Sequence, residues 1–243
     1  MNKQTFLTLL ATFALLFSFT FSCHAKGKDK AKHVVFIGLD GWGAYSLPKA
    51  DMPNVKKLME DGAYTLKKRS ALPSSSAINW ASMFMGAGPE LHGYTEWGSK
   101  TPELPSRVLN KNGIFPTVFQ LLRDARPEAE IGCLYEWEGI KYLVDTLSLS
   151  YHYHVADCNK TPKELGNMAS SYIKEKHPAL VAICYDGPDH TGHTAGHDTP
   201  EYYEKLKELD MYVGQIVQAV KDAGMLDDTI FILTSDQIGR AHV

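Results

Sequence analysis

The feature that most constrains the fold is an alternation of short apolar runs with longer amphipathic segments, which begins at Ala31. Short continuous runs of Val, Ile and Leu are typical of strands that are buried on both faces of a mainly parallel sheet. Strands that alternate with helices predict an α/β fold with a mainly parallel central sheet flanked by helices on both faces. The expected strands are Val34–Leu39, Ile131–Tyr135, Leu180–Tyr185 and Thr229–Thr234, and the expected helices are Pro53–Glu60, Ile78–Met85, a segment near Pro116–Asp124, Pro162–Lys176 and Pro200–Ala223.

Three of the expected strands have acidic residues at or close behind their carboxyl ends. In an open α/β sheet, ligands bind at the edge formed by the carboxyl ends of the strands. If the three strands are neighbours, their carboxylates converge on one crevice, and divalent cations are the natural remedy for the repulsion between them. The residues concerned are Asp40 after the first strand, Asp186 and Asp189 after the third, and Asp236 after the fourth.

A histidine, His193, follows Asp189 in the segment Pro188–His193. Carboxylate and imidazole ligands suit zinc, or manganese where more oxygen donors are present. A single Asp-x-x-x-His pattern arises often by chance. Its position at a strand end, together with Asp40 and Asp236, predicts a metal site.

The segment Leu72–Trp80 carries three consecutive serines directly before an expected helix. A hydroxyl at a helix N-terminus beside a cation is activated because the metal lowers its pKa, and free backbone N–H groups there can receive a phosphate oxygen. Taken alone, the segment is more typical of a serine-rich turn that caps a helix. The functional interpretation depends on the carboxylates lying nearby.

Five motifs occur in a fixed order between about Lys32 and Asp236. They are Gly38-Leu39-Asp40-Gly41, Pro73-Ser74-Ser75-Ser76-x-x-Asn79, Gly86-x-x-Pro89-Glu90-x-His92-Gly93, Pro188-Asp189-x-x-Gly192-His193 and Thr234-Ser235-Asp236. This order resembles the type I phosphodiesterase / nucleotide pyrophosphatase branch of the alkaline phosphatase superfamily. The resemblance implies an alkaline phosphatase-like fold and the hydrolysis of phosphodiesters or phosphomonoesters through a covalent phospho-enzyme.

The resemblance also implies a set of metal ligands. Asp40 and Asp236 would bind one ion together with the oxygen of Ser76, while Asp189 and His193 would bind the other. Two divalent cations, Zn²⁺ or alternatively Mn²⁺, would then clamp the phosphoryl group of a small-molecule phosphate ester.

Ser76 stands at the position of the family's nucleophile, and Ser75 is the alternative because three serines in a row permit a shift of register. Asn79, or neighbouring backbone N–H groups, would support the charged oxygens. Two positions depart from the family pattern. Trp80 stands where the family usually has the His of Pro-Asn-His, and Trp97 occupies the place of an Asn that contacts phosphate in nucleotide-cleaving members, which weakens the case for nucleotide diesters.

The remaining polar and aromatic residues near these motifs have two interpretations each. Trp80, Tyr94 and Trp97 suit either an aromatic substrate platform or ordinary packing, and packing is the commoner role of such residues. We interpret His92 as structural. His197 suits an accessory polar group or the entry to a helix, and we do not expect it to be a ligand.

Residues 1–25 have the features of a secretory signal peptide, with Lys3 before the apolar run Phe6–Phe21, and residues 26–32 form a basic linker. Cleavage after Ala25 would give a periplasmic or secreted protein, whereas Cys23 would provide a lipid anchor. An uncleaved anchor helix is the third possibility. In every case we expect export.

The composition excludes several functions. The net charge of −3 argues against a dedicated binder of nucleic acid or of anionic membranes. The cysteines Cys133, Cys158 and Cys184 show no paired spacing, which argues against a thiolate zinc site, although an oxidising compartment would permit one disulfide.

Residues 237–243 depart from the family pattern, in which a His directly follows the Asp of Thr-Ser-Asp and a further His ligand comes later. From Ile238 onward the residues match the translation of a common sequencing-adapter string, and the Gln237 codon would share its first base with a His codon. We interpret 237–243 as adapter-derived and 33–236 as an α/β domain whose C-terminal part is missing. This predicts an inactive, poorly soluble chain, and resequencing the gene tests it.

Two other functions remain open. A sulfatase or phosphonate hydrolase of the same superfamily is one, although sulfatases carry Cys/Ser-x-Pro-Ser-Arg and Pro73 here precedes the serines. A non-catalytic exported binding protein is the other, and it would leave the strand-end carboxylates without a purpose.

Overall fold

The computed structural model has a central sheet of five strands in the order β3-β2-β4-β1-β5, and every strand pairing is parallel. The structure describes residues 31–156 and 161–237. The predicted signal peptide, Cys23, Cys158 and the tail from Ile238 onward lie outside these residues. The strands are β1 (His33–Leu39), β2 (Ile131–Tyr135), β3 (Tyr151–His154), β4 (Leu180–Tyr185) and β5 (Thr229–Thr234).

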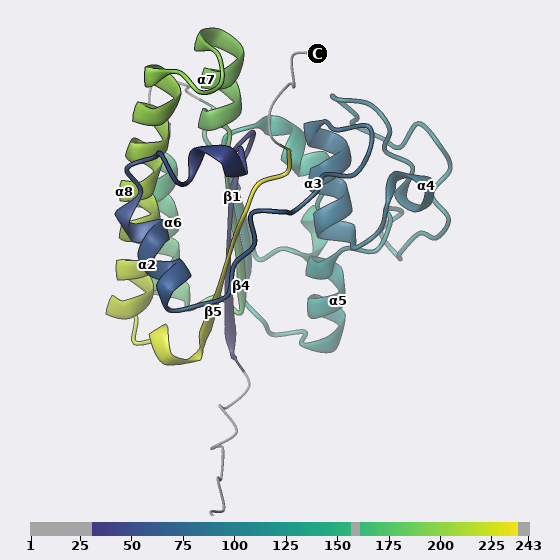
Figure 1. Ribbon diagram of the computed structural model, residues 1–243. Helices are drawn as coiled ribbons and strands as arrows, with labels where there is room; N and C mark the ends of the chain where they lie inside the picture. Colours follow the sequence, from purple (N-terminus) through teal and green to yellow (C-terminus); the bar gives the residue numbers. More distant parts are fainter. Residues whose placement is uncertain (1–30, 157–160, 238–243) are drawn as a thin grey trace, which may run out of the picture. The chain divides into compact units, whose positions relative to one another are not determined.

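Helices cover both faces of this sheet, which confirms the predicted α/β architecture (Figure 1). On one face lie α2 (Pro53–Glu60), α6 (Lys163–Lys176) and α8 (Pro200–Asp222). On the other lie α3 (Ser76–Met85) and α5 (Val118–Ala125). The shorter elements are α4 (Pro89–His92), α7 (Gly187–Ala195) and the 3₁₀ helices η1 (Ala44–Ser46), η2 (Glu138–Tyr142), η3 (Thr146–Ser148) and η4 (Leu226–Asp228).

The two helical layers produce two apolar cores, one on each face of the sheet. Side chains alternate between the faces of a strand. Val35, Ile37 and Leu39 of β1 therefore join the core beneath α2, α6 and α8, while Val34 and Phe36 pack against the core beneath α3 and α5. Strands buried in this way read as continuous apolar runs, which is why the sequence pattern identified them.

Besides α4 and the short 3₁₀ helices, two elements were not expected from the sequence. Residues Gly187–Ala195 form the helix α7, although Gly, Thr and His are poor helix formers and mask its periodicity. Residues Tyr151–His154 form the edge strand β3, which is polar and only half-buried. The helix α7 matters for function because it carries Asp189 and His193.

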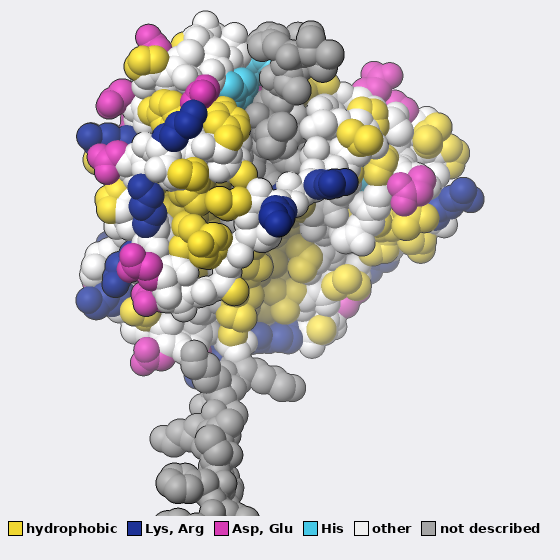
Figure 2. Space-filling view, viewed as in Figure 1, with side chains coloured by type: hydrophobic (Ala, Val, Ile, Leu, Met, Phe, Trp, Pro, Cys, Tyr) yellow, Lys and Arg dark blue, Asp and Glu magenta, His cyan; other side chains and the backbone are white. Residues whose placement is uncertain are grey.

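The prediction that Thr229–Thr234 is buried on both faces is wrong. In the described sheet β5 has β1 as its only neighbour, and Ile230 and Ile232 are 50% and 43% exposed. Phe231 and Leu233 point to the opposite face and pack against the core beneath α8. Hydrophobic side chains accordingly gather between the two helical layers on the face drawn in Figure 2.

The start of α2 is stabilised by a side chain from α8. Met52 at the N-cap position provides no side-chain hydrogen bond. Instead the buried Asp210 accepts bonds from the backbone N–H groups of Asn54 (3.1 Å) and Val55 (2.9 Å) and from the Asn54 amide (2.8 Å). A carboxylate at a helix N-terminus satisfies orphan donors and interacts favourably with the helix dipole, so this contact fastens α2 to α8.

In the part of the chain that the structure describes, no helix has the length and apolar character needed to cross a lipid bilayer.

Candidate active site

The three strands that end in acidic residues are neighbours, because β1 lies between β4 and β5. Asp40, Asp189 and Asp236 therefore meet at the carboxyl edge of the sheet, as the sequence predicted. All three are buried, with exposed fractions of 2%, 7% and 0%. Burying several carboxylates together is costly unless hydrogen bonds, protons or cations compensate their charge.

The side-chain amide of Gln237 lies at the centre of this group. Its Nε2 donates to Ser76 Oγ at 3.0 Å, to Asp189 Oδ1 at 3.3 Å and to Asp40 Oδ1 at 3.4 Å. Ser76 Oγ in turn lies 3.5 Å from Asp40 Oδ1, which is the acceptor of its hydroxyl. Three of the predicted site residues thus surround one nitrogen atom.

Asp236 is held by backbone donors on one side and is unsatisfied on the other. Its Oδ1 accepts from the N–H groups of Gly41 (3.1 Å) and Gln237 (2.7 Å), whereas its buried Oδ2 has no hydrogen-bond partner among the described residues. Gly41 has a φ of +66°, and a Cβ atom there would lie 2.7 Å from the Cα atom of Asp189. Only glycine permits this close approach of the turn after β1 to the helix α7.

Asp189 and His193 project from the same face of α7, since residues four apart in a helix are neighbours. Asp189 Oδ2 and His193 Nε2 lie 3.1 Å apart. The Asp-x-x-x-His spacing found in the sequence is thus a helical spacing, and it brings the two side chains into contact.

Burial dominates the electrostatics of the site. It raises the pKa of Asp40 well above its ordinary value, and the carboxylates of Asp236, Asp189 and Asp186 raise it further. Burial also raises the pKa of Asp236 to about 6 and raises that of Asp189, where the neighbouring His193 works in the opposite direction. Without a cation, these carboxyl groups therefore keep their protons to a higher pH than usual, and a divalent ion would compete with those protons.

The chemistry of these side chains fits divalent cations. Carboxylate oxygens, a serine oxygen and an imidazole nitrogen suit zinc or manganese, and the unsatisfied Oδ2 of Asp236 is a buried acceptor. Within residues 31–156 and 161–237, no three His, Cys, Asp or Glu side chains converge as one metal-holding group. The predicted ligands instead form pairs, and the Gln237 amide occupies the space between them.

Ser76 is the first residue of α3, and Ser75 is the extended residue before it. The Ser76 hydroxyl contacts Asp40 and Gln237, whereas the Ser75 hydroxyl is buried without a hydrogen-bond partner in the described structure. Ser75 does not cap the helix with its side chain. The arrangement favours Ser76 as the nucleophile.

Asn79 uses its side chain to hold the segment before α3. Its Oδ1 accepts from the N–H of Ala71 at 2.6 Å, and its Nδ2 donates to the carbonyls of Ser75 (3.1 Å) and Ala71 (3.3 Å). This fixes the approach of the serines to the helix. Support of a phosphate oxygen by Asn79 stays a prediction, and it would require these bonds to be exchanged.

Two contacts to this site were not foreseen from the sequence. Trp80 Nε1 donates to Asp40 Oδ2 at 2.9 Å, and Glu136 Oε2 accepts from the backbone N–H of Asp186 at 2.7 Å. Glu136 directly follows β2, so the rule of strand-end acids, applied to all four predicted strands, would have found it. Trp80 was singled out as a departure from the family pattern and as an aromatic platform or packing residue, but not as a partner of Asp40.

The aromatic residues divide between packing and exposure. Trp80 and Tyr94 are buried, and the Tyr94 hydroxyl donates to the Tyr142 carbonyl at 3.0 Å. Trp97 is 65% exposed and lies 6.4 Å from Trp137, measured between ring centroids.

The two predicted non-ligand histidines have packing roles. His92 is buried, with Nε2 3.1 Å from Ser82 Oγ and Nδ1 accepting from the N–H of Tyr94, in agreement with a structural role. The ring of His197 packs against Tyr202 and closes over Gly192.

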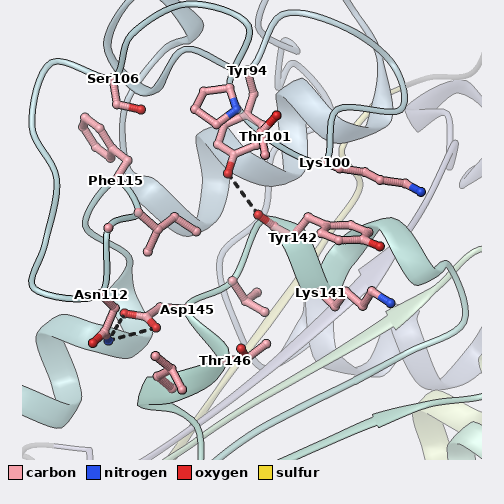
Figure 3. Close-up of a pocket in the computed structure, with 15 residues that line it drawn as sticks. Tyr94, Lys100, Thr101, Ser106, Asn112, Phe115, Lys141, Tyr142, Asp145 and Thr146 are labelled. Atoms are coloured by element: carbon pink, nitrogen blue, oxygen red, sulfur yellow. Dashed lines mark hydrogen bonds between the residues drawn. The ribbon is translucent and has the colours of Figure 1, made fainter.

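A cavity of about 290 Å³ is lined by residues of the segment that follows α4 and by residues of η2 and η3 (Figure 3). Its lining includes Tyr94, Phe115 and Tyr142, and the ammonium groups of Lys100 and Lys141 lie 5.6 and 4.9 Å from the centroid of the Tyr142 ring. None of the carboxylates of the candidate site lines it. This cavity is separate from the Asp40 cluster.

A sequence profile described as type I phosphodiesterase / nucleotide pyrophosphatase matches residues 34–238. The chain belongs to this family. The family resemblance read from the five motifs is therefore confirmed, and with it the placement in the alkaline phosphatase superfamily.

Similar proteins are longer than this chain. It is 25% identical over 219 residues to the bis(5'-adenosyl)-triphosphatase enpp4 of Mus musculus, a match that covers 86% of this chain and 47% of that protein. It is 24% identical over 212 residues to the ectonucleotide pyrophosphatase/phosphodiesterase family member 1 of Mus musculus, covering 83% of this chain and 23% of that one. The chain thus spans about half the length, or less, of these curated relatives.

Among solved structures, the fold is similar to that of murine ectonucleotide pyrophosphatase/phosphodiesterase 5, an inactive variant in complex with AMP. The TM-score is 0.65 at 18% identity, and the match covers 86% of this chain and 57% of that one. At this identity the likeness shows the fold.

Proposed function

We propose that the protein is a metal-dependent phosphate ester hydrolase that acts through a covalent phosphoserine at Ser76. The observation that carries this proposal is the convergence of Ser76 Oγ, Asp40 Oδ1 and Asp189 Oδ1 around one Gln237 nitrogen, at distances of 3.0 to 3.4 Å. These groups come from α3, the end of β1 and α7, so the fold itself assembles them.

Five residues would hold the metal ions. Asp40, Asp236 and the Ser76 oxygen form one set, and Asp189 and His193 form the other. When bound, two divalent cations supply positive charge that lowers the pKa of a hydroxyl and neutralises phosphoryl oxygens. Zinc is the proposed metal because His193 adds a nitrogen to the oxygen donors, and manganese is the alternative.

The residues of the chain perform the remaining steps. Ser76 Oγ loses its proton to solvent and forms a bond to phosphorus as the bond from phosphorus to the leaving ester oxygen breaks, and the leaving oxygen departs as an alcohol after taking up a proton from solvent. A monoester then leaves a phosphoserine, and a diester leaves a phosphoserine that still carries its second ester group. The uncapped N–H groups of the first turn of α3 receive a phosphoryl oxygen, since a helix N-terminus favours anions. Asn79 keeps the segment before α3 in place. Water then cleaves the phosphoserine and restores the hydroxyl.

The substrate we propose is a small-molecule phosphate ester, with nucleotides as candidates because relatives carry names such as triphosphatase and pyrophosphatase. We further propose that the protein is exported, through cleavage after Ala25 or through a lipid anchor at Cys23.

The test compares serine variants of the product of the complete reading frame, because this chain spans about half of its relatives. Each protein is loaded with zinc and assayed with 4-nitrophenyl phosphate and bis(4-nitrophenyl) phosphate. Ser76→Ala should abolish turnover and remove a phosphorylated peptide detectable by mass spectrometry, and Ser75→Ala should retain both. Loss with Ser75→Ala alone would reassign the nucleophile. Turnover of aryl sulfates instead would favour the sulfatase alternative, and binding without turnover would favour a binding protein.

A further inference from the structure

We propose that Trp80 is a positioning residue for the Asp40 carboxylate: its indole N–H holds Oδ2, so that Oδ1 is the oxygen that faces the other predicted ligands. The inference rests on the proposed function, because it concerns the same site. Trp80 Nε1 donates to Asp40 Oδ2 at 2.9 Å, and the two residues are 1% and 2% exposed. A hydrogen bond to a buried carboxylate is among the stronger ones in proteins.

The two oxygens of Asp40 thereby have different partners. Oδ2 is bound by Trp80, whereas Oδ1 faces Ser76 Oγ at 3.5 Å and Gln237 Nε2 at 3.4 Å. Turning the carboxylate to present both oxygens to one ion would break the bond to Trp80. The geometry therefore favours Oδ1 as the oxygen that Asp40 presents to a cation.

The chemistry of indole suits this task better than that of the histidine expected at this position. The indole N–H only donates, so it neither accepts a proton nor binds a metal ion. An imidazole would carry a basic nitrogen that titrates near neutral pH and competes for the cation. Trp80 thus fixes Asp40 without adding a second ligand.

The surroundings of Trp80 hold its ring in one orientation. The ring stacks on Phe84 with centroids 5.7 Å apart and meets Phe36 edge-on at 6.4 Å. Gly38 of β1 makes room for it, because a Cβ atom at that position would lie 2.2 Å from Cη2 of Trp80. Gly38 and Asp40 are two residues apart, and both contact Trp80: Gly38 leaves space for the ring, and Asp40 accepts its N–H.

The experiment removes the N–H while keeping the ring. In the product of the complete reading frame, Trp80 is replaced by benzothienylalanine, which has a sulfur in place of the N–H, and separately by Phe. Cobalt affinity is measured by competition with a chelating dye, and the cobalt d–d absorption reports the ligand geometry. Trp97→Phe, which changes an exposed tryptophan, is the matched control.

We expect both Trp80 replacements to weaken cobalt binding by about 10- to 100-fold, the range typical of partners that orient metal ligands, and to change the d–d spectrum. Thermal unfolding of the benzothienylalanine protein in chelator should match the wild type, which separates positioning from folding. Gly38→Ala should weaken cobalt binding in the same direction by displacing the ring. Trp97→Phe should change neither quantity.

Two results would overturn the inference, and they are distinguishable. If the wild type binds cobalt and the benzothienylalanine protein binds it equally well with the same spectrum, Trp80 only packs, and the proposed hydrolase function is untouched. If the wild type binds no divalent cation at all, the proposed function fails and the role of Trp80 fails with it.

Discussion

Replacing Glu136 by Gln should stabilise the metal-free protein at alkaline pH. Glu136 follows β2, and its Oε2 accepts from the N–H of Asp186 at 2.7 Å. Its Oε1 is buried without a hydrogen-bond partner in the described structure. Burial is the main reason why the pKa of Glu136 rises from 4.5 to about 7. Gln keeps an oxygen acceptor for Asp186 and removes the charge that burial disfavours.

The sign and the size of this change in the free energy of unfolding follow from the pKa of Glu136. The fold favours the protonated acid, so its contribution to stability is fully present below pH 4.5 and is lost as the pH rises through about 7. The difference between these two values corresponds to about 3 kcal/mol, since each tenfold change in proton affinity is worth about 1.4 kcal/mol. Glu136→Gln should therefore gain up to about 3 kcal/mol over the wild type between about pH 4.5 and about pH 8.5.

The assay is urea unfolding of both proteins in chelator at these two pH values. Comparing the two proteins removes the contribution of the other buried acids, which titrate in both. Glu138→Gln is the control, because this neighbouring carboxylate is exposed and paired with Lys141, and it should show no such gain. If the advantage of Glu136→Gln is the same at both pH values, the assignment of a raised pKa to Glu136 is wrong.

Three further predictions follow from single contacts. Asp210→Ala should lower the free energy of unfolding by about 2–4 kcal/mol, because it leaves donors at the start of α2 unsatisfied; urea unfolding measures this, and the exposed Asp222→Ala should cost far less. Gln237→His should raise zinc affinity by at least about tenfold, since it replaces an amide N–H beside Asp40 and Asp189 by a nitrogen ligand. Titration calorimetry measures this affinity, and an equal zinc affinity of the variant and the unchanged protein would contradict the prediction. Zinc should raise the melting temperature at pH 8 more than at pH 5, because the raised pKa values of Asp236 (about 6) and Asp189 leave protons that compete with the metal at low pH; an equal rise at both pH values would speak against binding by these acids.

The strands of the sheet were predictable because burial on both faces leaves an uninterrupted apolar run. The bounds of β2, β4 and β5 match the predicted ones. The degree of burial was less predictable, because an edge strand such as β5 can be equally apolar. In sequence, Ile230 and Ile232 resemble the residues of β4. The two strands differ in that β4 lies between two strands of the described sheet, whereas β5 pairs with β1 alone.

The part of the candidate site that lies at the ends of strands was predictable from the sequence. Asp40 directly follows β1 and Asp236 comes two residues after the end of β5, so the parallel pairing of these strands brings the two residues together. Asp189 and His193 were found by their spacing, although the helix α7 that explains the spacing was hidden by its glycines, threonines and histidines. The contact between Trp80 and Asp40 joins residues 40 positions apart. It depends on the packing of α3 on β1, which no local pattern encodes.

The measurement that tests the central claim most directly is anomalous diffraction at the zinc absorption edge, from crystals of the complete gene product grown with zinc. We predict two anomalous peaks at the carboxyl edge of the sheet. One should lie at about 2.0–2.2 Å from oxygens of Asp40 and Asp236, and the other at the same distance from Asp189 and His193. Ordered side chains of Asp40, Asp189 and Asp236 with no anomalous peak among them would contradict the proposed metal site and the hydrolase built on it.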